Sequence, residues 1–93
     1  MAIKSFKHKG IAKFFSTGSK AGIQAAHASK LNRQLTLLNV ATVPEMMNVT
    51  GWKFHALHGD LDGHFAVWVS GNWRLTFTFD GSDAVLVDYQ DYH

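Results

Sequence analysis

Residues 64–89 read HFAVWVSGNWRLTFTFDGSDAVLVDY, and apolar and polar side chains alternate along much of this stretch. A period of two with many β-branched and aromatic residues is typical of β-strands. The pair Gly71–Asn72 divides the stretch and favours a tight hairpin. Because such short links cannot carry a parallel crossover, the pattern predicts an antiparallel meander. Its strands are expected at His64–Ser70, Trp73–Phe79 and Ala84–Tyr89.

The part of the chain before this meander predicts two helices. Apolar residues recur there at helical spacing, and Gly18 is a plausible stop for the first helix. In chain order we expect a short strand at Met1–Phe6, helices at Lys7–Ser16 and Gln24–Ala41, a connector at Thr42–Thr50 and a strand at Trp52–Leu57. The fold class is therefore α+β, a single domain over residues 1–93. Its N-terminal strand and two helices pack on one face of a mainly antiparallel four- to five-stranded sheet.

The composition limits the class of protein. The chain has 93 residues, of which 46% are hydrophobic and 17% are charged, and this balance is typical of one globular domain. With no cysteine it can form neither a disulfide framework nor a thiolate metal site, which suits a reducing compartment. The N-terminus is too charged for a signal peptide and no apolar run reaches membrane-spanning length. We therefore expect a soluble, cytoplasmic protein.

The charges are unevenly distributed along the chain. Residues 1–46 hold seven Lys and Arg against one Glu, a net charge of +6. Residues 47–93 hold two against six Asp, a net charge of −4. A basic half favours an anionic partner such as RNA, because neutralised phosphates release counterions. The alternative explanation is a basic helix face that is merely solvated.

Strand alternation also assigns side chains to the two faces of the sheet. If the apolar faces meet the helices, Lys53, His55, Arg74 and Thr76 line the opposite, open surface. Such a polar, basic surface could receive a phosphodiester backbone, provided that no bulge shifts the register. The three tryptophans are expected in the core instead: Trp52, Trp68 and Trp73.

The chain ends in Asp88-Tyr89-Gln90-Asp91-Tyr92-His93. A polar tail after a last strand can simply fray. This one also supplies a carboxylate, a phenol and an imidazole. RNA is cut without a metal when its 2′-OH attacks the adjacent phosphate, which needs a base, an acid and a cation. These parts would come from His55, Arg74, Asp91 and His93, although each of them singly has an ordinary structural explanation.

A metal site is an alternative use of the same histidines. His55-x-x-His58, with His64 nearby, could hold zinc or nickel. That spacing at a strand end matches no strong metal signature. The RNA-cutting chemistry needs neither a metal nor another cofactor.

Four segments together resemble a known family. They are IKSFKHKG at 3–10, the Leu57-x-Gly59-Asp60-x-x-Gly63 turn, NWRLTF at 72–77 and the closing Asp88-Tyr89-x-Asp91-Tyr92-His93. In this order they resemble the HigB-type toxins of the RelE/ParE superfamily of bacterial toxin–antitoxin systems. The resemblance runs nearly from end to end, and the Asn-Trp-Arg segment and the Asp-Tyr-His terminus are its most specific elements.

The resemblance implies a RelE/ParE-like fold and a ribosome-dependent endoribonuclease, an mRNA interferase that inhibits translation. Such toxins cut messenger RNA in the ribosomal A site. They are neutralised by a HigA-like helix-turn-helix antitoxin, and the free toxin is expected to be monomeric. The partners would thus be the antitoxin, the 30S subunit with its ribosomal RNA, and mRNA, with no membrane. The functional residues of the family fall on His55, Arg74, Asp91, Tyr92 and His93.

Residues of the open surface would assist substrate binding, namely Lys53, His58 and Thr76. Many relatives carry Lys where this chain has His58, so phosphate binding could be weaker or depend on pH here. ParE-like relatives share the fold but inhibit DNA gyrase without cutting RNA, so a protein-binding toxin is the alternative function. A catalytically inactive partner of the antitoxin is a third. The choice of base and acid, the codon preference and the geometry of the antitoxin complex stay open at this level.

Overall fold

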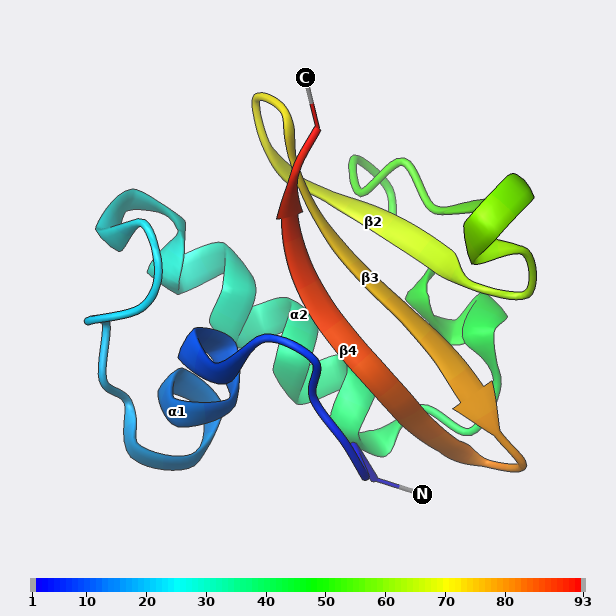
Figure 1. The fold of residues 1–93 in the computed structure, drawn as a ribbon, viewed down its shortest axis with the longest axis horizontal. Coiled ribbons are helices and arrows are strands. Elements are labelled where there is room, and N and C mark those ends of the chain that lie inside the picture. The colour runs from blue at the N-terminus through cyan, green and yellow to red at the C-terminus, as the bar shows by residue number, and fades with distance from the viewer. Residues whose placement is uncertain (1, 93) are drawn as a thin grey trace.

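The computed structural model describes residues 2–92. Two helices pack against one face of a four-stranded antiparallel sheet with the order β1-β2-β3-β4 (Figure 1). The elements are α1 Lys9–Thr17, α2 Ala28–Val40, β1 His55–Ala56, β2 Phe65–Ser70, β3 Trp73–Asp80 and β4 Asp83–Asp91, with short 3-10 helices at Ala25–His27, Pro44–Met47 and Gly59–Leu61. The α+β class, the meander and the placement of both helices on one face are confirmed.

Both ends of α1 follow from local sequence. His8 caps its start, where Nδ1 accepts a hydrogen bond from the Ile11 N–H at 3.1 Å. Gly18 ends it with a left-handed φ of 80°, and its N–H donates to the Phe14 carbonyl oxygen. The predicted stop at Gly18 is confirmed. The second helix begins at Ala28, later than predicted, because Ala25–His27 forms a 3-10 turn before it.

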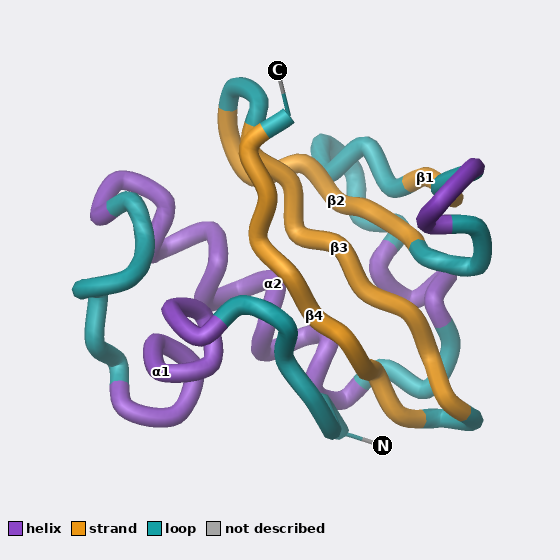
Figure 2. The backbone as a smooth tube through the Cα atoms, viewed as in Figure 1, coloured by secondary structure: helices purple, strands orange, loops and turns teal. Residues whose placement is uncertain are grey.

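The core lies between α2 and the sheet. Leu31, Leu35 and Leu38 repeat at helical spacing and are fully buried. They join the buried side chains of one sheet face, which include Leu75 and Phe77. The predicted apolar faces of helix and strand therefore meet. Figure 2 shows α1 and α2 together on this side of the sheet and neither of them on the other face.

The predicted strand at Trp52–Leu57 is shorter than expected. Only His55–Ala56 pairs with β2, because Lys53 has a φ of 52° and turns the chain before the strand begins. Trp52 is still tied to the sheet, since its carbonyl oxygen accepts the Trp68 N–H at 2.6 Å. The turn thus sets Lys53 at the edge of β2 instead of inside a strand.

The N-terminal segment lies along the other edge of the sheet, beside β4 (Figures 1 and 2). Two isolated parallel bridges, Ile3 with Ala84 and Phe6 with Val87, replace the predicted strand. A bulge in β4 falls between them, where the register with β3 shifts and Leu86 takes a φ of 55°. The bulge lies outside the rows of residues that form the candidate site.

Candidate functional site

Two neighbouring rows of side chains cross the face of the sheet that the helices leave open. In one row His55 pairs with Ala66 and Ala66 with Thr76. In the next row Arg74 lies between Trp68 and Gln90. Regular strand spacing separates the Cα atoms of His55 and Arg74 by about 12 Å, so both side chains can reach one phosphodiester. The predicted sharing of one face by these two residues agrees with the register.

His55 is exposed, and one hydrogen bond determines which of its ring nitrogens carries the hydrogen. Its Nδ1 lies 2.8 Å from the Lys53 carbonyl oxygen. A carbonyl oxygen only accepts, so Nδ1 must carry the hydrogen. The nitrogen left to gain or lose a proton is Nε2, which is a base in the neutral ring and an acid in the charged ring.

Arg74 is held at the β2–β3 hairpin. Its Nη1 donates to the carbonyl oxygens of Gly71 at 3.0 Å and Trp73 at 3.1 Å. Its Cζ lies 5.9 Å from the centre of the Tyr92 ring. The Tyr92 N–H in turn donates to the Asn72 carbonyl oxygen at 2.8 Å. One hairpin therefore brings the guanidinium and the phenol together, and part of the guanidinium fork is left for a phosphate.

The C-terminal residues continue the sheet. The predicted last strand ended at Tyr89, whereas β4 extends to Asp91, which pairs with Trp73. Burial raises the pKa of the Tyr89 phenol, and the charge of the exposed Asp91 raises it further. His93, the remaining predicted catalytic residue, lies outside the described residues. The tail is thus ordered by strand pairing as far as Asp91 and by the hairpin at Tyr92.

The predicted substrate-binding residues fall in different environments. Lys53 and His58 are exposed, and His58 directly precedes a 3-10 turn. Thr76 is only 1% exposed, so its predicted place on the open surface is wrong. It does share a face with Arg74, but it sits mid-sheet between Ala66 and Asp88 and neighbouring side chains cover it.

The alternative metal site is not assembled in the part of the chain that the structure describes. Within residues 2–92, no three His, Cys, Asp or Glu side chains gather closely enough to hold an ion. The three histidines of that alternative also differ in exposure: His55 and His58 are exposed, whereas His64 is half-buried.

Trp68 is the residue of this face that sequence reasoning missed. It was expected in the core, yet it is half-buried on the open face, and two lysine ammonium groups lie over its ring. The alternation of β2 carried the signal, because Val67 and Val69 are buried and Trp68 between them must face the other way. Its side-chain Nε1 donates to the Gly71 carbonyl oxygen, which also accepts from Arg74.

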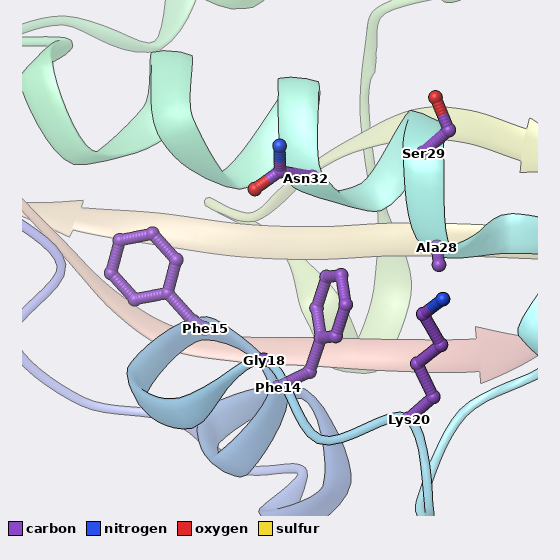
Figure 3. Close-up of a pocket in the computed structure, with 7 residues that line it drawn as sticks. All are labelled: Phe14, Phe15, Gly18, Lys20, Ala28, Ser29 and Asn32. Carbon is purple, nitrogen blue, oxygen red and sulfur yellow. The ribbon is translucent and has the colours of Figure 1, made fainter.

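A separate pocket opens between the two helices. Figure 3 shows the Phe14 and Phe15 rings rising from α1 towards α2, with Lys20 beside them. The pocket lining is Phe14, Phe15, Gly18, Lys20, Ala28, Ser29 and Asn32. None of the predicted site residues lines this pocket, so the pocket is separate from the candidate site.

The fold and this face define a class: small α+β domains that carry an imidazole, a guanidinium and a phenol on the face of the sheet opposite the helices. The chain belongs to the RelE-like toxins of the HigB type II toxin–antitoxin system, whose family model matches residues 4–93. It is similar to the endoribonuclease HigB of Proteus vulgaris, with 40% identity over 91 residues that cover 98% of this chain and 99% of that protein. The family resemblance seen in the sequence is confirmed.

The family assignment has two direct consequences. A toxin of a type II system implies an antitoxin as its partner. The assignment to the HigB type also favours an RNA-cutting toxin over the gyrase-inhibiting alternative. Separately, none of the helices in residues 2–92 has the length and apolar character needed to cross a membrane.

Proposed function

We propose that this toxin is a ribosome-dependent endoribonuclease that cuts messenger RNA in the ribosomal A site and so stops translation. The observation that supports this most strongly is the arrangement of His55, Arg74 and Tyr92 on one open face. The imidazole with its free Nε2 and the partly unpaired guanidinium supply an acid–base group and a cation for RNA cleavage, and the aromatic ring can stack on a base. The name of the Proteus vulgaris relative points to the same reaction.

The proposed reaction is attack by the RNA on itself. A base removes the 2′-OH proton, the 2′ oxygen bonds to phosphorus, and the bond from phosphorus to the 5′ oxygen breaks. An acid protonates that leaving oxygen, and the other product carries a 2′,3′-cyclic phosphate. Arg74 stabilises the charge that develops on the phosphate oxygens, because its planar fork matches them.

The acid and the base come from the two ends of the site. We assign proton removal to Asp91 or His93, and protonation of the leaving oxygen to His55 through Nε2. Tyr92 stacks on or orients a base next to the cleaved bond. Lys53 and His58, both exposed near His55, contact phosphates of the substrate. Neither a metal nor another cofactor takes part in these steps.

The proposal also assigns partners and a location. The antitoxin is a HigA-like protein with a helix-turn-helix, and the free toxin is a monomer. The second partner is the ribosome with its bound mRNA, and binding at the A site puts the protein in the cytoplasm. The net positive charge of residues 1–46 supports an RNA-rich partner.

The test is cleavage of a defined message by the purified toxin. Programmed ribosomes with an empty A site and the same mRNA without ribosomes are incubated with toxin, and new 5′ ends are mapped by primer extension. We expect cuts in the A-site codon on ribosomes only. These cuts should disappear with His55→Ala and His93→Ala, and persist with Ser16→Ala, which changes an exposed residue of α1.

Intact mRNA in every lane would overturn the proposal. A gyrase supercoiling assay run in parallel tests the alternative class directly. Inhibition of gyrase by a protein that leaves mRNA intact would move the assignment to a ParE-like toxin. Cleavage that persists in both histidine variants would contradict the assigned site.

A further inference from the structure

Two lysines from distant parts of the chain converge on the ring of Trp68. The Nζ atom of Lys30, on α2, lies 4.4 Å from the ring centre, and that of Lys53, before β1, lies 4.9 Å from it. Each ammonium is attracted by the π-electrons of the ring. The two charges also repel one another. Positive charge is therefore concentrated around the Trp68 ring at the edge of β2.

The surroundings do not neutralise this charge. Arg33 is exposed one turn along α2, and burial together with the charges of Arg33 and Lys53 lowers the pKa of Lys30. Within residues 2–92, no ion pair joins Lys30, Arg33 or Lys53 to a carboxylate, and the one lysine ion pair found there is Lys4 with Asp83. Three cations and an aromatic ring without an acidic partner are arranged as for an anionic ligand.

The cluster is continuous with the candidate active site. Trp68 pairs across the sheet with Arg74, and both side chains donate to the Gly71 carbonyl oxygen, at 2.9 Å and 3.0 Å. Beyond Arg74 lies the Tyr92 ring. Cations and aromatic rings thus alternate from the end of β4, over β3 and β2, to α2. Proteins that bind single-stranded nucleic acid combine a basic track with rings on which bases stack.

We propose that Trp68, Lys30 and Lys53, with Arg33 at the rim, form a second RNA-binding site that extends the candidate active site across β2. An unpaired base stacks on the Trp68 ring and displaces the exposed Lys53 ammonium from it. The displaced ammonium then contacts the neighbouring phosphate, and Lys30 remains beneath the ring. The inference rests on the proposed function in that its ligand is RNA, either messenger or ribosomal.

Binding to two probes tests the site and separates the two sources of RNA. One probe is a fluorescent oligoadenylate with 2′-O-methyl groups, which cannot be cut because the attacking hydroxyl is blocked. The other is the 30S subunit without mRNA. The variants are Trp68→Leu, Trp68→Phe and the pair Lys30→Gln with Lys53→Gln. The matched control is the pair Lys9→Gln with Lys13→Gln, which removes the same charge from exposed positions of α1.

Loss of the stacking ring should weaken binding by about five- to a hundredfold in Trp68→Leu, while Trp68→Phe keeps most of the affinity. For the oligonucleotide, the Lys30–Lys53 double variant should lower the slope of log affinity against log salt by about 0.7, because the phosphate contact of Lys53 is lost. Weakened binding to the oligonucleotide identifies messenger RNA as the ligand. Weakened binding to the 30S subunit alone identifies ribosomal RNA.

Equal affinities of wild type, the Trp68 variants and the lysine pair for both probes would overturn the inference. It would also be overturned if the wild type bound neither the oligonucleotide nor the 30S subunit. An effect of the α1 control as large as that of the lysine pair would overturn it too, since it would mean a general charge effect. If Trp68→Leu does not fold, as judged by its thermal unfolding, the lysine pair and Trp68→Phe decide the outcome. Binding that depends on Trp68 without cleavage on ribosomes would leave this inference standing and defeat the proposed function.

Discussion

At His55, the hydrogen bond from Nδ1 to the Lys53 carbonyl oxygen makes the two ring nitrogens chemically different. The bond holds the ring and leaves Nε2 for proton transfer. The turn at Lys53, with its φ of 52°, sets that carbonyl oxygen two residues before the histidine. The irregular backbone at Lys53, outside the strand, therefore orients the His55 side chain, to which we assign protonation of the leaving oxygen.

The residue-scale prediction separates these two roles of the ring. Asn at position 55 can donate to the Lys53 carbonyl oxygen from its amide but has nothing in place of Nε2. His55→Asn should therefore fold like the wild type and cut mRNA about 10²- to 10⁴-fold more slowly in single-turnover reactions on ribosomes. His58→Asn, a change of the same type at an exposed neighbour, should have a much smaller effect. Wild-type rates in His55→Asn would remove His55 from the proton transfer.

Among the elements, α1 is defined by its own sequence and β1 is not. The His8 cap and the Gly18 stop lie within a few residues of the helix that they bound. By contrast, β1 is reduced to two residues because the chain turns at Lys53 while Trp52 bonds to Trp68. A partner distant in sequence decides that turn, and alternation within residues 52–57 could not reveal it.

The element-scale prediction concerns the end of α1. Gly18 has a φ of 80°, and a Cβ added there would have no atom within 4 Å. Substitution thus tests backbone strain without a steric clash. Gly18→Ala should lower the free energy of unfolding by about 1 kcal/mol, because alanine disfavours the left-handed conformation. Gly18→Asn should cost less. Urea unfolding of both variants measures this, and an equal loss in the two would refute the conformational explanation.

On the scale of the whole molecule, His27 ties the helical layer to the last strand. Its Nδ1 lies 2.6 Å from the Tyr89 hydroxyl, across 62 positions of sequence. Tyr89 is 4% exposed and stacks on Trp73 with 4.4 Å between ring centres. The residues before α2 are thereby held against the strand that carries Asp91. Burial lowers the pKa of His27, so folding favours its neutral ring.

This linkage predicts how stability changes with pH. Because the pKa of His27 is lower in the folded state, the unfolded chain binds the proton more readily. The His27 contribution is fully present above the unfolded pKa of about 6.5 and is lost as pH falls through the folded value. Stability should therefore decrease from pH 7.5 to 5.5, and less steeply in His27→Asn. Thermal unfolding across this range, with His58→Asn as the control, measures the difference. Identical pH profiles for wild type and His27→Asn would contradict it.

The sequence by itself determined the class of fold, the meander, the stop at Gly18, the family and the face shared by His55 and Arg74. These features follow from local chemistry, since alternation, helical spacing and turn residues act over a few positions. The tertiary structure decided that Thr76 is covered, that Trp68 receives Lys30 and Lys53, and that β1 is short. Alternation assigns a side chain to a face, but its exposure and its neighbours depend on elements that arrive from elsewhere in the chain.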